Sequence, residues 1–323
     1  MNQSVPPIPR IPHILVLMGG PDAEREVSLM SGREIAAALR ESDRFEVREA
    51  VIDRPDAGEL RAIIGEADAV FPALHGRWGE GGPLQALLEE LAVPYVGSRP
   101  KPAALAMNKL ATKTMLAPHR VRTPRARLLE PGAPCDLEPP IVLKPVDDGS
   151  SVDLRFCHTR EAVDVGRAEL HPRRHSLLAE EMITGREITL GIVLDELLPL
   201  IEIQPKTTFY DYAAKYTRDD TTYVVSPELP EEVIRECRHG AETAYRQLGC
   251  RDVARVDFLL DERGPWFLEI NTMPGFTTHS LVPMAARAHG RPMPELCAAL
   301  VENALKRGVS PGGPQRFPAA SLV

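Results

Sequence analysis

Two neighbouring apolar segments near the C-terminal end of the chain carry polar side chains at alternate positions. Residues 255–260 read RVDFLL and residues 266–271 read WFLEIN. The short connection between them contains a glycine where a three-residue hairpin loop, residues 262–264, needs a left-handed conformation. We therefore expect the two segments to pair as antiparallel strands.

In this register Asp257 lies opposite Glu269 and Arg255 lies opposite Asn271, all on one face of the hairpin because strand side chains alternate. Two facing carboxylates repel one another unless a cation lies between them, and oxygen ligands suit Mg²⁺ better than zinc. Magnesium in turn suggests a phosphate-bearing substrate. The alternative is a solvated sheet face on which the arginine neutralises both acids. The opposite face is predicted to be core, with Val256, Phe258 and Leu260 against Ile270, Leu268 and Trp266.

A second candidate site follows the apolar strand predicted at 141–144. Lys144 ends this strand, and a flexible, hydroxyl-rich segment with Gly149, Ser150 and Ser151 comes shortly after it. Such loops can bind phosphate through backbone N–H groups, although most are simple turns. The chain has no GK[ST] sequence at this place and no GxGxxG after its first strand. A P-loop and a dinucleotide-binding loop are therefore not supported.

Two further polar segments could contact a nucleotide. Glu180, Glu181 and Glu187 flank an apolar pair and could accept hydrogen bonds from a ribose or an adenine amino group, although surface acids are the commoner explanation. Residues 209–216 hold four aromatic side chains and Lys215 in an otherwise polar stretch. Exposed aromatics in a loop suggest a lid.

The elements that must position these residues divide the chain into two parts. In the first hundred residues strands and helices alternate, which predicts a doubly wound α/β domain. The strands are predicted at 13–20, 45–52 and 69–74, and the helices at 28–40, 60–64 and 83–91. The remainder has α+β character. Its helices are predicted at 108–116, 231–248 and 293–306, with alternating strand patterns at 176–203.

Composition limits the function classes. The chain has 323 residues, 43% of them apolar, and a net charge of −8, which disfavours binding to nucleic acid or to an anionic membrane surface. Its five scattered cysteines contain no CxxC pair and favour free thiols over a zinc site or a disulfide scaffold. No apolar run approaches the length of a membrane helix or of a signal-peptide core, so we expect a cytoplasmic protein.

Five motifs in a fixed order resemble the D-alanine:D-alanine ligase family of the ATP-grasp superfamily, from about His13 to Lys306. They are HG at 75–76 with GE at 79–80, PYVGS at 94–98, KP at 144–145 with GSSV at 149–152, FYDY at 209–212 with KY at 215–216, and EINTMPG at 269–275 with HSL at 279–281.

The resemblance implies an ATP-grasp enzyme that joins two D-alanines through an acyl phosphate for peptidoglycan synthesis, with ATP and two Mg²⁺ or Mn²⁺ ions as cofactors. It also implies a homodimer. The expected domains are an N-terminal α/β domain at 1–101, a central ATP-grasp subdomain at 102–186 and a C-terminal subdomain at 187–307, with a flexible tail at 308–323.

The resemblance also assigns roles to single residues. Metal ligands would be Asp257, Glu269 and Asn271. ATP would be bound by Lys109, Lys144, Ser151, Glu180, Glu181, Glu187 and Lys215. The catalytic groups would be Glu26, Ser150, Tyr216, Arg255, Gly275 and Ser280, and the substrate would also meet His75 and Leu281.

Four positions depart from the family pattern. Asp153 stands where the family has glycine, and its charge is expected to weaken ATP binding, so that Asp153→Gly would lower the KM for ATP. The other three are Gly81, Asn108 and Ala213, the first two replacing acids and the third a glutamate. Two alternatives therefore remain: a ligase with another acceptor, such as D-lactate or D-serine, and a non-catalytic nucleotide-binding protein.

Overall fold

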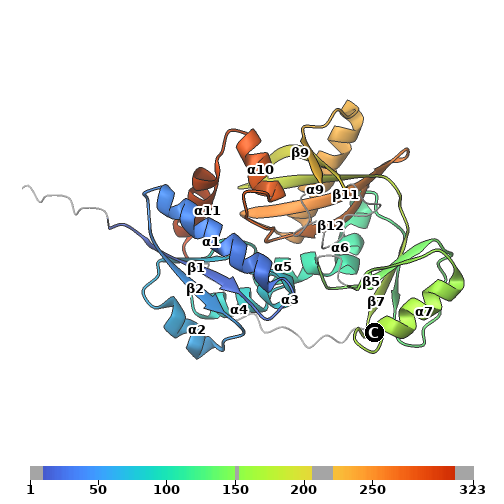
Figure 1. The fold of residues 1–323 in the computed structure, drawn as a ribbon, viewed down its shortest axis with the longest axis horizontal. Helices are drawn as coiled ribbons and strands as arrows, with labels where there is room; N and C mark the ends of the chain where they lie inside the picture. Colours follow the sequence, from blue (N-terminus) through green and yellow to red (C-terminus); the bar gives the residue numbers. More distant parts are fainter. Residues whose placement is uncertain (1–9, 150–152, 206–220, 310–323) are drawn as a thin grey trace, which may run out of the picture.

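The structure is a computed structural model of the 323-residue chain and describes residues 10–149, 153–205 and 221–309. Within these residues the strands form three separate sheets (Figure 1). No helix among them is long and apolar enough to cross a membrane, and their five cysteines are all free thiols.

The N-terminal sheet is parallel, with strand order β2-β1-β3. Its central strand, β1 (His13–Gly19), is almost completely buried, as expected for a parallel sheet covered by helices on both faces. The doubly wound α/β arrangement predicted for the first hundred residues is confirmed. The flanking elements are β2 (Glu46–Ile52), β3 (Ala69–Pro72), α1 (Arg25–Glu41), α2 (Ala57–Ile64), α3 (Gly76–Gly79) and α4 (Pro83–Glu90).

The central sheet is antiparallel, with strand order β4-β7-β5-β6. Helix α7 (Arg160–Leu170) packs on it and contributes Val163 and Leu170 to a small core. The helix begins at an N-cap, Thr159, whose hydroxyl accepts a hydrogen bond from the backbone of Ala162. The strands are β4 (Ala126–Leu129), β5 (Ile141–Pro145), β6 (Arg155–Cys157) and β7 (Leu177–Glu181).

The C-terminal sheet is also antiparallel, with strand order β10-β9-β8-β11-β12. The long helix α9 (Glu231–Leu248), predicted with the same bounds, packs its apolar side on this sheet, where Cys237, Ala241 and Tyr245 join the core. The strands are β8 (Arg186–Val193), β9 (Glu196–Gln204), β10 (Thr222–Val225), β11 (Val253–Asp261) and β12 (Gly264–Asn271).

The hairpin of β11 and β12 confirms the predicted pairing around the charged residues. Asp257 pairs with Glu269, and Arg255 pairs with Asn271. These two pairs are consecutive on one face because the residue between them on each strand points to the other face. The candidate metal ligands are therefore neighbours in the folded chain.

Beyond this point the predicted register is wrong. A β-bulge follows the first acid, so Phe258 pairs with Phe267 instead of Leu268, and the hairpin loop contains two residues, 262–263, instead of three. The extra residue on β12 shifts the alternation of side chains by one position. Phe267 is consequently fully buried with its ring 5.9 Å from that of Phe258, whereas Leu268 faces the cavity described below.

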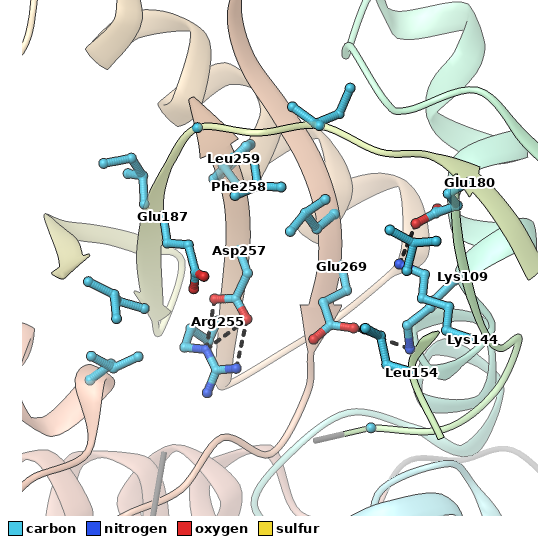
Figure 2. Close-up of a pocket in the computed structure, with 18 of the residues that line it drawn as sticks. Lys109, Lys144, Leu154, Glu180, Glu187, Arg255, Asp257, Phe258, Leu259 and Glu269 are labelled. Atoms are coloured by element: carbon cyan, nitrogen blue, oxygen red, sulfur yellow. Dashed lines mark hydrogen bonds and ion pairs between the residues drawn. The ribbon is translucent and has the colours of Figure 1, made fainter. Parts of the chain in front are cut away.

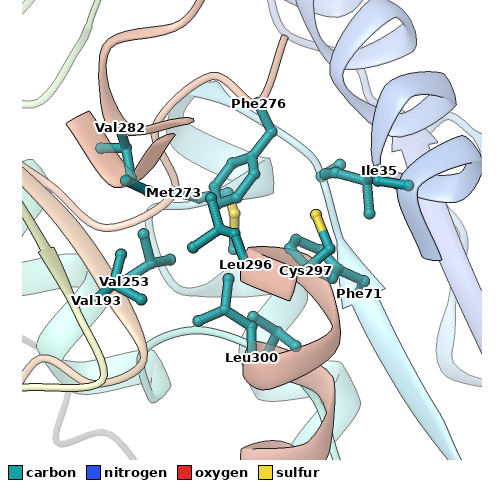
Figure 3. Packing of buried hydrophobic residues seen from close by; sticks show 14 of the residues in the cluster. Ile35, Phe71, Val193, Val253, Met273, Phe276, Val282, Leu296, Cys297 and Leu300 are labelled. Carbon is teal, nitrogen blue, oxygen red and sulfur yellow. The ribbon is translucent and has the colours of Figure 1, made fainter. Parts of the chain in front are cut away.

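Helices from other parts of the chain join the three sheets. The last helix, α11 (Met293–Arg307), packs on α1 and places Leu296 and Leu300 beside Ile35 and Phe71 of the N-terminal region (Figure 3). The same cluster includes Val193 and Val253 of the C-terminal sheet. Helices α5 (Pro100–Met107) and α6 (Lys109–Leu116) pack against the C-terminal sheet and α9, and η1 (Ala117–His119) and α10 (Leu281–Ala288) complete the fold.

Candidate active site

A cavity of about 1130 Å³ lies between the central and C-terminal sheets and reaches helix α1 (Figure 2). The residues predicted to do chemistry gather around it, although they come from elements far apart in the sequence. The predicted site residues that line it are Lys109, Lys144, Glu180, Glu181, Glu187, Arg255, Asp257, Glu269, Gly275, Ser280 and Leu281. Ser150, Ser151, Lys215 and Tyr216 lie outside the described residues.

The hairpin places two acids on the cavity wall, each held by a cation of the protein. Arg255 forms a bidentate pair with Asp257, with Nε and Nη2 at 2.9 and 2.7 Å from its carboxylate oxygens. Thr189 of β8 donates to the same carboxylate at 2.6 Å. Glu269 pairs with Lys109 Nζ at 3.2 Å. Both carboxylates are thus fixed in orientation while they face the cavity.

This donor set fits a hard divalent ion. Asp257 and Glu269 offer carboxylate oxygens from directly paired positions, and the amide oxygen of Asn271 accepts a hydrogen bond from the backbone of Met273 at 3.0 Å, which fixes that side chain at the end of the strand. Oxygen ligands of this kind suit Mg²⁺ or Mn²⁺. Among the described residues no group of three or more His, Cys, Asp or Glu forms a metal site, so a mixed carboxylate and amide set is the arrangement these strands offer.

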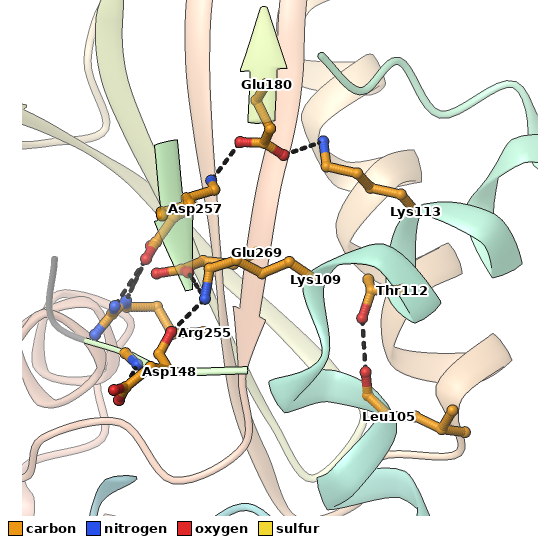
Figure 4. Close-up of polar contacts among 11 residues, drawn as sticks. Leu105, Lys109, Thr112, Lys113, Asp148, Glu180, Arg255, Asp257 and Glu269 are labelled. Atoms are coloured by element: carbon orange, nitrogen blue, oxygen red, sulfur yellow. Dashed lines mark hydrogen bonds and ion pairs between the residues drawn. The ribbon is translucent and has the colours of Figure 1, made fainter. Parts of the chain in front are cut away.

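Glu180 has a different environment from the one expected of an adenosine ligand. Its side chain is 3% exposed and lies between two lysines, with one oxygen 2.8 Å from Lys113 Nζ and the other paired with Lys144 (Figure 4). Burial opposes ionisation of Glu180, but the charges of Lys144 and Lys113 outweigh it and lower its pKa. Lys113, which sequence reasoning missed, therefore helps to hold Lys144 at the cavity wall.

The cavity wall beyond this cluster is mainly apolar. Val142, Met182, Ile183 and Leu268 contribute side chains from the central sheet, the β7–β8 connection and β12. A flat apolar ring system fits such a surface. Glu181 and Glu187 lie at its margins. Glu181 is 3.2 Å from Arg125 Nε, and Glu187 pairs in register with Leu259 on β11.

The loop after β5 reaches the cavity through Asp148 and Gly149. Lys109 Nζ donates to the carbonyl oxygen of Asp148, and its backbone N–H donates to the carbonyl of Val146 at 2.9 Å. The same lysine pairs with Glu269, so it links the loop to the acidic hairpin. An ammonium group between the loop and the hairpin is placed to pair with a phosphate bound in the cavity.

His75 contacts the turn after β12 and is not among the residues lining the cavity. Its Nδ1 is 3.0 Å from the carbonyl oxygen of Met273, which requires a proton on Nδ1 and leaves Nε2 as an acceptor. Burial, together with the charge of Arg255, lowers the pKa of His75 to about 4, so the ring is neutral at pH 7. Within the described part of the chain, Nε2 is buried with no hydrogen-bond partner.

Glu24, not Glu26, is the acid that α1 directs towards the site. Neither acid is among the residues that line the cavity, but Glu26 is exposed in the first turn of α1. Glu24 is 8% exposed, and its carboxylate oxygens lie within about 4 Å of the place where a Cβ on Gly149 would stand. Because two acids two positions apart at a helix start point in different directions, sequence alone did not separate them. We therefore propose Glu24, in place of Glu26, for the predicted role at the first substrate.

A second buried acid accompanies it. Glu80 accepts hydrogen bonds from the backbone of Gly76 at 3.1 Å and of Met273 at 3.2 Å. Burial, followed by the negative charge of Glu24, raises its pKa well above the usual value. Glu80 thus ties the turn after β3 to the turn after β12, both of which border the site.

Residues 275–281, called the substrate loop below, contain the predicted site residues Gly275, Ser280 and Leu281. Helix α1 holds this loop in place. Ser31 Oγ accepts from the backbone of Phe276 at 3.1 Å, and Glu34 accepts from the backbone of Thr278 at 2.6 Å. Ser280 Oγ accepts from the backbone of Thr277 at 2.9 Å and begins α10, with Leu281 next in the cavity wall.

Three of the four departures have local explanations. A Cβ on Gly81 would lie 2.4 Å from the carbonyl oxygen of Arg77, so this backbone has no room for the acid found in the family. Asn108 is the N-cap of α6 and accepts from the backbone of Ala111 at 2.9 Å, as an aspartate would. Asp153 has a left-handed φ of 59° and pairs with Arg173 and Arg174. Ala213 lies outside the described residues.

Comparison with known proteins shows the same family over both halves of the chain. The model of the D-ala D-ala ligase C-terminus matches residues 130–302, and that of the N-terminus matches residues 55–98. The D-alanine--D-alanine ligase of Bordetella petrii is 40% identical over 96% of this chain and 99% of its own length. That of Dechloromonas aromatica is 42% identical over 90% and 96%.

This chain belongs to the D-alanine--D-alanine ligase family. Solved structures agree with this placement. The Bacillus anthracis ligase complexed with ATP aligns with a TM-score of 0.81 and 30% identity over 92% of this chain and 98% of that one. The Coxiella burnetii ligase aligns with a TM-score of 0.77 and 27% identity over 92% and 94%. The ATP-grasp fold expected from the sequence is therefore confirmed, whereas the domain boundaries and the roles of single residues remain predictions of this ligase.

Proposed function

We propose that this ligase joins two D-alanines to D-alanyl-D-alanine with ATP and Mg²⁺, for peptidoglycan precursor synthesis. One observation carries the proposal: Asp257, Glu269, Lys109, Lys144 and Arg255 converge from separate elements on one cavity with an apolar wall beside them. An apolar wall next to closely spaced cations and carboxylates suits a nucleoside triphosphate with its metal. Membership of the ligase family supports the identity of the reaction.

In the bound complex the adenine would lie against Val142, Met182 and Leu268, and the phosphates would extend towards Lys109 and Lys144. Asp257, Glu269 and Asn271 would hold the divalent ions, which supply positive charge to the terminal phosphates. Arg255 and Lys109, which pair with Asp257 and Glu269, keep these acids in place. Lys144 is itself fixed by Glu180, so little side-chain entropy is lost when it meets a phosphate.

In the first step a carboxylate oxygen of the first D-alanine attacks the γ-phosphorus, and the bond between that phosphorus and the bridging oxygen of ADP breaks. The products are D-alanyl phosphate and ADP. The role of this chain is to hold the two anions against one another despite their charges. Arg255 and Lys109 provide the positive side chains for this.

In the second step the amine of the second D-alanine attacks the carbonyl carbon, and the tetrahedral intermediate breaks its bond to phosphate. The attacking amine gives up one proton, which leaves with the departing phosphate as hydrogen phosphate, and the nitrogen keeps one N–H in the new peptide bond. Arg255 and the backbone N–H of Gly275 would stabilise the developing oxyanion, and Ser280 with the start of α10 would receive the second carboxylate. The hydrogen bonds from α1 keep this loop in place.

The test is phosphate release from ATP in the presence of Mg²⁺ and D-alanine, with mass spectrometry of the product. We expect one phosphate for each D-alanyl-D-alanine formed. Binding of ATP without D-alanine-dependent phosphate release would contradict the proposal and favour a nucleotide-binding protein. Preferential incorporation of D-lactate or D-serine in mixed-acceptor assays would instead contradict the acceptor assigned here.

We propose further that the ligase works as a cytoplasmic homodimer, as the family resemblance implies. Light scattering coupled to size-exclusion chromatography measures the first property, with a mass of twice 35.5 kDa expected. Cell fractionation measures the second. A monomeric mass, or recovery in the membrane fraction, would contradict these two expectations.

A further inference from the structure

The connection between β5 and β6 contributes Asp148, Gly149 and Leu154 to the wall of the nucleotide cavity. Its ends come together because the two strands pair antiparallel, with Leu143 opposite Arg155. Asp148 and Gly149 on one side and Leu154 on the other line the cavity. The placement of these three cavity residues therefore depends on what holds the chain at residues 148 and 153.

One arginine from outside the cavity contacts both ends. Arg174 lies in the connection between α7 and β7, with Nη2 2.6 Å from Asp148 and Nε 3.0 Å from Asp153. It does not line the cavity itself. The carboxylates are 20% and 11% exposed and Arg174 is 29% exposed, so the contact is partly shielded from water. A planar guanidinium suits such a bridge, because its nitrogens are held in a fixed geometry.

The bridge is joined to the phosphate-facing side of the cavity through Asp148. The carboxylate of this residue accepts from the backbone of Gly149 at 2.9 Å, and its carbonyl oxygen accepts from Lys109. Asp153 in turn adopts a left-handed φ of 59°, a conformation that aspartate tolerates better than most residues. Its carboxylate is thereby paired with Arg174 and with Arg173, whose Nη1 lies at 3.1 Å.

We propose that Arg174 is a positioning residue for ATP binding, and that Asp153 is its partner rather than a defect of the phosphate loop. The arginine fixes Asp148 and Asp153, which adjoin the cavity residues Gly149 and Leu154, and neutralises two acids close to the expected triphosphate. The expectation that Asp153 weakens ATP binding is thereby reversed, because its charge is paired within the protein. The inference rests on the proposed function only in that the cavity binds ATP.

The first experiment measures the dissociation constant of Mg-ATP by calorimetry on the full chain without D-alanine. Arg174→Gln should raise this constant by about tenfold, since two acids lose a shared charged partner. Arg174→Lys should raise it nearly as much, because an ammonium cannot bridge both carboxylates. Arg155→Gln, which breaks an exposed pair with Glu169 at 3.1 Å, is the matched control and should change it less than about twofold. Wild-type affinity in either Arg174 variant would overturn the proposal.

The second experiment tests whether Asp153 and Arg174 act as a pair. In the wild-type background Asp153→Gly should weaken Mg-ATP binding several-fold. In the Arg174→Gln background the same change should strengthen binding, because it then removes a carboxylate that has lost its main partner. An effect of the same sign in both backgrounds would overturn the proposal.

A steady-state readout separates positioning from general loss of structure. The KM for ATP should rise in Arg174→Gln, while the KM for D-alanine stays within about twofold of wild type, because the substrate loop is held by α1 instead. Equal increases in both constants would contradict a local role. Since the affinity measurements need no D-alanine, an enzyme that fails to make the dipeptide would refute the proposed reaction and leave this inference testable.

Discussion

Two groups of charged residues border the cavity and differ in how complete they are. Glu180 is 3% exposed, and both its oxygens are taken by lysines from α6 and β5. Asp257 and Glu269 are 19% and 27% exposed and face the cavity while paired with Arg255 and Lys109. The same residue types thus form two groups. In the closed group, Glu180 is fully paired with Lys113 and Lys144. In the open group, Asp257 and Glu269 are paired with Arg255 and Lys109 but still face the cavity.

The two groups differ in the consequence of removing an acid. Around Glu180 the loss would leave the buried Lys113 and the mostly buried Lys144 without their shared carboxylate, which costs folding free energy. Around the hairpin the loss would expose groups that water can reach, so the cost falls on the reaction instead. The comparison therefore distinguishes acids that stabilise the folded site from acids that act in the reaction. Variants of each group can test this distinction.

The largest effect is expected for Asp257→Asn, which keeps the shape of the side chain and removes its charge. D-alanine-dependent phosphate release should fall by about a thousandfold or more, because an acid facing the expected metal is lost. Asp261→Asn, at the far end of the same strand beside Arg263, is the control and should retain activity. Turnover near the wild-type rate in the first variant would remove Asp257 from the open group.

The closed group is tested by Glu180→Gln. We expect the free energy of unfolding in denaturant to fall by about 3 kcal/mol, because Lys113 keeps its charge in a buried place and Lys144 loses the carboxylate that pairs with it. The neighbouring Glu181→Gln breaks a pair in which Arg125 is 75% exposed and should cost less than about 1 kcal/mol. Equal losses in the two variants would contradict the stabilising role assigned here to Glu180.

His75 extends the comparison to a buried group that is neutral. Its pKa is about 4 in the folded protein against about 6.5 in the unfolded chain, so between these values the unfolded state binds more protons and stability falls as pH falls. From pH 7 to pH 5 this residue alone should remove about 2 kcal/mol. His75→Asn should flatten this part of the stability curve, measured by denaturant unfolding at each pH. An unchanged slope would mean that the histidine does not titrate as inferred.

The smallest effect is expected at the start of α6, which carries Lys109 and Lys113. Asn108→Ala removes the N-cap and should lower stability by about 1 kcal/mol, whereas Asn108→Asp should leave it nearly unchanged. Thermal unfolding of the two variants measures the difference. If both variants unfold at the same temperature, the side-chain cap at residue 108 does not stabilise the start of α6.

The sequence predicted most of the architecture because the relevant patterns are local. The buried strand before the first glycine turn, the amphipathic α9 and the facing acids of the hairpin each follow from periodicity within one or two elements. The bulge after Asp257 does not, since it depends on how Phe267 packs against Phe258 and α9. Short elements such as α3, α5 and β6 were also missed.

The site was less accessible to sequence reasoning than the fold, because most of its contacts join distant residues. Nothing near Glu180 in the sequence indicates that Lys113 lies beside it, and Arg174 reads as one of several basic residues in a polar turn. The choice between Glu24 and Glu26 likewise depended on burial. Charge pairing across the fold decides these cases, and only the three-dimensional arrangement reveals it.

The packing of α11 on α1 affects the order in which the parts of this protein can fold during synthesis. The α1 and β3 side of the N-terminal sheet is completed by Leu296 and Leu300, which leave the ribosome more than two hundred residues after β3, the last strand of that sheet. Until then an apolar surface stays uncovered on the nascent chain, open to chaperones or to other chains. A ligase shortened before residue 293 should for the same reason aggregate rather than yield a usable N-terminal domain.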